Sequence, residues 1–463
     1  MKIVAMVGDG HSNIYPTRDA KIAFRSLPIQ LYIFTDGMII RSATKDNDAL
    51  VGATVMKIGG VPIDEAYERI RPLVGRDSEM GLKFFAPYLL TMPEVLNAVG
   101  LSSSIDSAEF TILKSGKEET VTLKPNGPVE ILPADTDVSW MPREGWVDMR
   151  DASTTPRWLR DPKNLFWYEY LPESKTVYAQ INQVGNKKDE SLADFAKRLT
   201  TFVDTNPVEK LVIDLRLNRG GNGTLLTPLE VALIKSKIDH PGKLFVLMGR
   251  STWSASQFFL NWMEKYSNAI FVGEPSASRG NVYGDSRKIT LANSGITARV
   301  SVYYWQDWEP WDTRLWFGPN VTAELSSTDY KTNNDPVLTA ALRYAPRPAL
   351  SALLNDALTT GGVDLVIKRF REFKSDPLNK YADTETALLD SGQRLLNEKK
   401  SAEALEIFKL DLNENPHSWR SYFAAGVAYN EGGKKDLAIM NLKKALELDP
   451  RNYDVASYLR QVK

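Results

Sequence analysis

Two turns in this 463-residue chain combine residue types that bind anions or supply nucleophiles. The first lies in LVIDLRLNRGGNG at residues 211–223, where Gly220, Gly221 and Gly223 let the backbone approach a ligand and expose its N–H groups. Such a loop at a helix N-terminus can bind an anion. Because neither a Walker Gly-Lys-Ser/Thr sequence nor the Rossmann spacing is present, a phosphate site is disfavoured. An oxyanion hole and a purely structural turn remain as interpretations.

The second turn is rich in serine and lies in VLMGRSTWSASQFF at residues 246–259. Ser254 stands at the start of an expected helix, where a serine acts either as the helix N-cap or as an exposed nucleophile. Both turns follow buried strands that we expect to be parallel neighbours. The carboxyl ends of parallel strands share one edge of a sheet, which is where α/β folds bind ligands. The sequence therefore predicts one site built from both turns.

The cysteine and histidine counts restrict the chemistry of this site. The chain has no cysteine, which excludes disulfides, thiolate metal sites and cysteine nucleophiles. A metal centre built from histidine would need nearly all of the three that are present, so we expect no metal and no other cofactor. If a histidine is the catalytic base, it is His11, His240 or His417.

Charge and hydropathy bear on partners and location. Lys and Arg number 57 and Asp and Glu 58, giving a net charge of −1, which disfavours a nucleic-acid partner. No apolar run approaches the roughly 18 residues of a membrane span, so no transmembrane segment is expected. The apolar stretch Ile3 to Val7 is too short for a signal peptide and predicts a buried strand or helix end. We expect that the chain is truncated and that residues 1–23 are the N-terminal part of a core.

The middle of the chain alternates between strands and helices. Strands are expected at 177–181, 211–215, 244–248 and 269–272, and helices at 192–202 and 254–266. This alternation is typical of an α/β core with several parallel strands. We assign residues 126–345 to this core.

Residues 24–125 form another predicted unit. A strand, a Gly-Gly turn and a second strand are expected at 50–61, a helix at 64–73 and a hairpin at 109–123. The order resembles a PDZ domain, although the aspartate that usually follows the glycine is absent. In such a domain residues 26–29 would form the carboxylate-binding loop, and residues 79–105 would be an insertion.

A 34-residue repeat marks the C-terminal end. Gly392 and Gly426, Ala404 and Ala438, and Pro416 and Pro450 are each 34 residues apart. The pattern is typical of tetratricopeptide helix pairs and predicts such a unit over residues 384–463. Residues 346–383 are expected to be a linker. The repeats either pack against the rest of the chain or bind a protein partner.

Three segments of the core resemble the C-terminal-processing, or tail-specific, serine peptidases. They are residues 214–221, DLRLNRGG, residues 254–257, SASQ, and residues 272–275, VGEP. The resemblance implies a crotonase/ClpP-like α/β protease core with an inserted PDZ-like domain, an extracytoplasmic location and polypeptide substrates. It also implies that Ser254 is the nucleophile and that the N–H groups of Ala255 and of Gly220 or Gly221 form the oxyanion hole.

The base must differ from the lysine of the best-known members. Arg279 stands at the lysine position, and arginine does not lose its proton at working pH. The tricorn-like branch of the family uses a histidine in a Gly-Asp-Gly-His segment, which is similar to residues 8–12, GDGHS. This resemblance implies that His11 is the base, with a pKa suited to proton transfer at neutral pH.

Other residues have roles that the sequence leaves open. The acceptors that could orient His11 are Asp9, Ser12, Glu274 and Asp285. Arg279 either holds a substrate carboxylate or forms an ion pair with one of these carboxylates. An aromatic run at residues 303–316 either lines a substrate groove or packs as core or lid.

Two functions from different classes follow. The first is a serine-type peptidase, a hydrolase that cleaves polypeptides through an acyl-enzyme. The alternative is a non-catalytic peptide-binding scaffold that keeps the protease fold but has lost its base, as the arginine at position 279 suggests.

Overall fold

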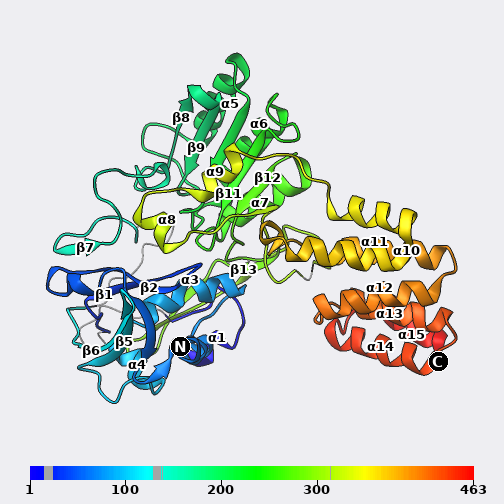
Figure 1. Ribbon diagram of the computed structural model, residues 1–463, viewed down its shortest axis with the longest axis horizontal. Coiled ribbons are helices and arrows are strands. Elements are labelled where there is room, and N and C mark those ends of the chain that lie inside the picture. The colour runs from blue at the N-terminus through cyan, green and yellow to red at the C-terminus, as the bar shows by residue number, and fades with distance from the viewer. Residues whose placement is uncertain (15–23, 129–136, 138, 313) are drawn as a thin grey trace. The chain divides into compact units, whose positions relative to one another are not determined.

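The computed structural model describes residues 1–463 apart from 15–23, 129–136, 138 and 313 (Figure 1). The chain divides into two compact units, Met1–Tyr344 and Ala345–Lys463. The first is mixed α/β and the second is helical, as the sequence indicates. The predicted boundary between residues 23 and 24 lies next to residues outside the described part.

The core of the first unit is a six-stranded sheet with the order β17-β12-β11-β10-β9-β8. The strands are β8 (Phe166–Leu171), β9 (Thr176–Ile181), β10 (Lys210–Asp214), β11 (Leu244–Met248), β12 (Ile270–Gly273) and β17 (Val321–Thr322). All pairs are parallel except β8 with β9. The expectation of several parallel strands is confirmed.

Helices pack on both faces of this sheet. The helices α5 (Leu192–Thr205), α6 (Thr227–Lys235) and α7 (Ala255–Tyr266) share a large apolar cluster with one face, and α9 (Pro336–Leu342) packs on the other. Because helices cover both faces, the strand Leu244–Met248 is wholly buried. This burial explains why its residues form a continuous apolar run. Neighbouring parallel strands β10 and β11 place the glycine-rich and serine-rich turns at the same sheet edge.

A second sheet has the order β1-β2-β3-β5-β6, with β4 on β3 and β7 on β2. Its strands are β1 (Ile29–Phe34), β2 (Gly37–Thr44), β3 (Thr54–Ile58), β4 (Val61–Pro62), β5 (Ala108–Lys114), β6 (Lys117–Leu123) and β7 (Trp146–Asp148). The helices α2 (Ile63–Ile70), α3 (Glu79–Leu89) and α4 (Pro93–Ala98) accompany it. The predicted Gly-Gly turn and hairpin are present, whereas the PDZ assignment stays a prediction.

The N-terminal helix α1 (Lys2–Ala5) corrects one expectation. The stretch from Ile3 to Val7 is helical at first, but it is not buried: Ile3 is 84% exposed and Met6 is 78% exposed. A helix of four residues is too short to bury its apolar side chains by itself. None of the residues of α1 is buried.

Two small antiparallel pairs lie between β12 and β17 in the sequence. They are β13 (Val282–Gly284) with β16 (Tyr303–Trp305) and β14 (Arg287–Thr290) with β15 (Thr297–Val300), and α8 (Ser327–Lys331) comes later. The aromatic run lies partly on β16, where Tyr303 is 61% and Trp305 is 42% exposed. Exposure of this size counts against the core-packing interpretation of these two residues.

The second unit contains only helices in its described part. They are α10 (Leu350–Ser375), α11 (Glu385–Asn397), α12 (Ser401–Glu414), α13 (Trp419–Glu431), α14 (Lys435–Leu448) and α15 (Tyr453–Val462). Small residues let the pairs approach: a Cβ at Gly392 would lie 2.3 Å from the Phe408 ring. Short 3-10 helices complete the chain at Lys45–Leu50, Arg71–Leu73, Arg157–Leu159, Pro172–Ser174, Gly223–Leu225 and Pro377–Asn379.

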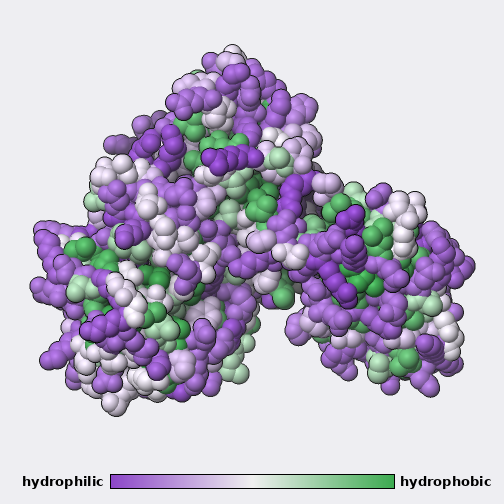
Figure 2. Space-filling view, viewed as in Figure 1, coloured by the Kyte–Doolittle hydropathy of each residue, from purple (hydrophilic) through white to green (hydrophobic). Residues whose placement is uncertain are grey.

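The helix α10 occupies most of residues 346–383, the segment that the sequence assigned to a linker. Leu354, Val366 and Phe370 of this helix belong to the core of the second unit. By length and composition α10 could also cross a membrane, a property shared by many core helices of soluble proteins. Hydrophilic residues cover much of the visible surface of both units (Figure 2).

Candidate active site

Ser254 and His11 face each other although they are far apart in sequence. His11 Nε2 lies 3.0 Å from Ser254 Oγ, which is a hydrogen-bond distance. Both side chains are half-buried. The structure brings the two expected residues together, and their catalytic roles remain a prediction.

A strained turn presents Ser254. Its φ of 59° and ψ of −124° lie where residues with a Cβ are rare, at a cost of about 1–3 kcal/mol. The turn is anchored because Thr252 Oγ1 donates to Leu215 O at 3.0 Å and Trp253 N–H donates to Ser256 Oγ at 2.8 Å. The Ser254 side chain caps no N–H of α7, so the N-cap interpretation does not apply.

Gly220 packs directly against this serine turn. A Cβ at Gly220 would lie 2.8 Å from Ser254 Cβ and 2.9 Å from Ala255 N, and the φ of Gly220 is 109°. Only glycine combines that backbone conformation with that approach. The Gly220 N–H donates to Asn218 Oδ1 at 2.8 Å, so this candidate oxyanion donor is already occupied.

The N–H groups of Gly221 and Ala255 donate no hydrogen bond within the described residues. The bridge between Gly221 and Val184 uses the Gly220 carbonyl and the Asn222 N–H, so the Gly221 N–H points to the opposite side of this segment. Ala255 begins α7, where the first N–H groups lack an acceptor inside the helix. Both N–H groups can therefore serve an anion.

Asp9 fixes the backbone on both sides of His11. Its Oδ1 accepts the His11 N–H at 2.8 Å and the Ser12 N–H at 2.6 Å. The same oxygen accepts Ser301 Oγ–H at 2.9 Å. Asp9 thus orients the loop that carries His11 and not the imidazole itself.

The imidazole of His11 is stacked against an indole ring and half-buried. The Trp253 ring lies 4.1 Å from it between centroids, with 20° between the planes. Burial lowers the pKa of His11, and the nearby Asp77, Asp9 and Asp285 carboxylates oppose this effect. The Tyr283 carbonyl also raises this pKa, although Nδ1 has no hydrogen bond of ordinary geometry in the described residues. A lowered pKa keeps His11 neutral at pH 7, the form that accepts a proton.

Sequence reasoning missed Asp77, which lies between α2 and α3. It is buried, and its carboxylate accepts hydrogen bonds from the Gly10 N–H at 2.8 Å and from Trp253 Nε1–H at 3.1 Å. Burial raises the pKa of Asp77, while the neighbouring His11 and these donors favour its charged form. No motif surrounds Asp77 in the sequence, and it falls inside the segment assigned to a separate domain.

The other candidates form no described hydrogen bond with the imidazole of His11. Arg279 is exposed and forms no ion pair with Glu274 or Asp285 in the described part of the chain. Glu274 instead binds Arg250, with 2.6 Å between Nε and Oε1, and Lys83 at 3.0 Å. Asp285 has a φ of 51° and accepts a hydrogen bond from the Trp305 indole, so it is a turn residue.

The two remaining histidines are both exposed. His240 belongs to the same compact unit as Ser254 but has no described contact with it, whereas His417 belongs to the helical unit. Of the two histidines of the first unit, His11 is the one that meets the serine.

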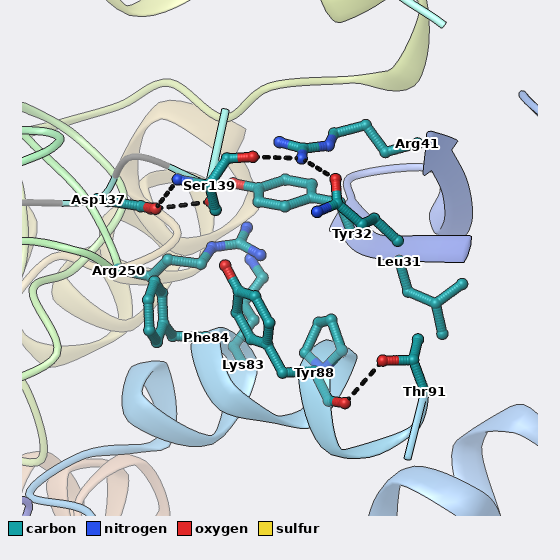
Figure 3. Close-up of a pocket in the computed structure, with 12 residues that line it drawn as sticks. Leu31, Tyr32, Arg41, Lys83, Phe84, Tyr88, Thr91, Asp137, Ser139 and Arg250 are labelled. Carbon is teal, nitrogen blue, oxygen red and sulfur yellow. Dashed lines mark hydrogen bonds between the residues drawn. The ribbon is translucent and has the colours of Figure 1, made fainter. Parts of the chain in front are cut away.

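A separate cavity of about 40 Å³ lies between β1 and α3 (Figure 3). Tyr32 and Tyr88 line it together with Arg41, Lys83 and Arg250. These cations have partners, since Arg41 donates to Gln30 Oε1 at 2.7 Å and the other two bind Glu274. None of the lining residues belongs to the Ser254–His11 pair, so we assign this cavity no part in the candidate active site.

Comparison with known proteins gives structural neighbours only. No model of a protein family matches the chain, and no curated protein matches it. The structure of mature CPAF complexed with lactacystin is similar with a TM-score of 0.49 and 11% identity, over 74% of this chain and 87% of that one. The photosystem II D1 C-terminal processing protease has a TM-score of 0.28 and 14% identity, over 69% and 80%. The first TPR domain of human RPAP3 has a TM-score of 0.19 and 23% identity, over 24% and 86%.

Proposed function

We propose that the chain is a serine peptidase that cleaves polypeptides through an acyl-enzyme. The observation that carries the proposal is the distance of 3.0 Å between Ser254 Oγ and His11 Nε2, on a turn that presents the serine in a strained conformation. A hydroxyl becomes a useful nucleophile when a neutral imidazole accepts its proton. The lowered pKa of His11 supplies that neutral form.

The reaction has two steps with a shared base. His11 Nε2 takes the proton of Ser254 while Oγ attacks the peptide carbonyl carbon, and the same proton then goes to the leaving amine as the C–N bond breaks. A water molecule attacks the resulting ester in the second step. His11 takes a proton from that water and returns it to Ser254 as the ester bond breaks, which releases the carboxylic acid.

The negative charge of each tetrahedral intermediate needs donors that are already in place. Gly221 and Ala255 supply two N–H groups without a described partner: Ala255 follows Ser254 directly, and Gly221 follows Gly220, which packs against the serine turn. One such donor contributes about 3 kcal/mol to lowering the barrier. The proposal therefore prefers Gly221 to Gly220, whose N–H already binds Asn218.

Other parts of the chain receive roles in the same proposal. Residues 24–125 would bind an extended polypeptide by strand addition, for which β1 is an edge strand in the described sheet. Residues 384–463 would bind a protein partner, and an extracytoplasmic location would suit such a peptidase. A crotonase/ClpP-like core is the fold proposed for residues 126–345.

The non-catalytic scaffold is the rival proposal. Arg279 motivates it, because an arginine cannot replace the lysine base. The distance between His11 and Ser254 counts against it, since a site without selection for proton transfer has no need of this alignment.

A serine-directed phosphonate probe separates the two proposals. The intact chain should be labelled, whereas Ser254→Ala and His11→Gln should not be. His240→Gln is the matched control, because it removes an exposed imidazole away from Ser254. Equal labelling of Ser254→Ala and the wild type would refute the nucleophile, and peptide binding without labelling of the wild type would support the scaffold.

A further inference from the structure

The buried carboxylate of Asp77 binds two residues of the candidate site. One directly precedes His11 in the sequence and the other directly precedes Ser254. Gly10, which precedes His11, donates its N–H to Asp77 Oδ1 at 2.8 Å. Trp253, which precedes Ser254, donates its indole N–H to Asp77 Oδ2 at 3.1 Å. The two segments therefore meet at Asp77 as well as at the reacting atoms.

A third segment reaches the same carboxylate. Ser278 Oγ lies 3.4 Å from Asp77 Oδ2 and accepts the Ser254 N–H at 3.3 Å. This hydroxyl can donate to the carboxylate while it accepts from the backbone. Ser278 thus joins Asp77 to the main chain of the nucleophile itself.

Tight packing fixes these segments without room for a shift. A Cβ at Gly10 would lie 2.8 Å from Asp77 Oδ2 and 3.1 Å from Trp253 Nε1. A Cβ at Gly75 would lie 2.3 Å from Ser12 O and 2.9 Å from Asp9 O. The backbone near Asp77 therefore packs directly against the loop that carries His11.

We propose that Asp77 is a positioning residue that holds His11 against Ser254 through Gly10 and Trp253 and places a negative charge beside the imidazole. The proposal rests on the proposed peptidase function. Asp77 accepts no described hydrogen bond from the imidazole, so it acts through the two neighbouring residues and through its charge. During attack by Ser254 the imidazole becomes positive, and a fixed carboxylate stabilises that charge.

Other charges near the imidazole do not replace Asp77. The carboxylates that face His11 are those of Asp77, Asp9 and Asp285. Asp9 is engaged with backbone N–H groups, and Asp285 is exposed on a turn. Three described cations, Arg76, Arg219 and Arg250, line one small cavity with Asp77, and the Arg219 guanidinium lies 5.8 Å from the centroid of the Trp253 ring.

Two variants separate the charge from the positioning. Asp77→Asn keeps the shape and removes the charge. Trp253→Phe keeps a ring against His11 and removes only the N–H that binds Asp77. Glu230→Gln is the control for loss of a buried carboxyl, because Glu230 lies on α6 and the charge that faces it is Asp307.

The first readout is the pKa of His11, measured by nuclear magnetic resonance of labelled histidine. The chain has three histidines, and His11→Gln assigns the signal. Because a nearby carboxylate stabilises the protonated imidazole, Asp77→Asn should lower the pKa of His11 further, by about one unit. Trp253→Phe keeps the carboxylate and should change this pKa less than Asp77→Asn does.

The second readout is the rate of labelling by the phosphonate probe at the pH plateau. Asp77→Asn should lose at least tenfold and Trp253→Phe several-fold, while Glu230→Gln should match the wild type. Folded Asp77→Asn with an unchanged His11 pKa, or an unchanged labelling rate, would overturn the proposal. If Asp77→Asn does not fold, a wild-type labelling rate in Trp253→Phe would overturn it. An unlabelled wild type would instead refute the peptidase, while the His11 titration still measures the charge of Asp77.

Discussion

The substitution Gly220→Ala tests whether the glycine-rich loop supports the nucleophile by direct contact. The new Cβ would lie 2.8 Å from Ser254 Cβ and 2.9 Å from Ala255 N, closer than real Cβ atoms come to other heavy atoms. The φ of 109° adds strain of about 1–3 kcal/mol for a residue with a side chain. The backbone neighbours cannot rotate away, so the Ser254 turn must shift.

The shift should affect the rate more than the stability. A displacement of about 1 Å in a reacting group costs about a hundredfold in rate, which corresponds to about 2.7 kcal/mol. The phosphonate labelling rate should therefore fall by about two orders of magnitude in Gly220→Ala. The midpoint of thermal unfolding should fall only as far as a loss of about 1–3 kcal/mol in stability, the backbone strain, requires.

The matched control is Gly242→Ala. Gly242 also has a positive φ, 79°, but a Cβ there would meet no atom within 4 Å. It should lose stability and keep the wild-type labelling rate. Equal labelling rates for Gly220→Ala and Gly242→Ala would refute the argument that Gly220 supports Ser254 by contact.

Three further predictions concern charge and packing. Because burial lowers the pKa of His11 and the neutral form is the base, labelling should rise with pH through a midpoint below the ordinary 6.5, and a midpoint above that value would contradict the argument. Replacing Arg250 with Met leaves the buried Glu274 with Lys83 alone and should cost about 3–5 kcal/mol in chemical denaturation. Gly392→Ala places a Cβ against the Phe408 ring and should lower unfolding stability by about 1–3 kcal/mol without changing the labelling rate.

The sheet core could be predicted because each strand carries its own signal. The apolar run Leu244–Met248 coincides with β11, and the turns after β10 and β11 lie at one edge because the two strands are parallel neighbours. Local composition determines such elements, since a strand that is buried on both faces has few polar residues. The hairpin of β5 and β6 has a different local signal, a short turn between two runs rich in β-branched residues.

Long-range contacts could not be predicted in this way. Asp77 acquires its surroundings from Gly10 and Trp253, which are 67 and 176 residues away, and nothing near Asp77 in the sequence indicates either contact. The prolines at 346 and 348 indicate a linker, whereas the segment that follows them forms helix α10. The apolar residues of α10 are buried by contacts with the helices that follow it, and such contacts cannot be read from the local sequence. The occupied N–H of Gly220 likewise depends on the orientation of one side chain, that of Asn218.

The separation of 243 residues between Ser254 and His11 has a consequence for biosynthesis. A chain still being made presents His11 long before the nucleophile exists, and Ser278, which holds the Ser254 main chain, follows later still. Contacts of such high sequence separation form late in folding. A nascent or shortened chain therefore cannot assemble the pair, so the proposed activity would arise only after most of the first unit has left the ribosome and closed upon itself.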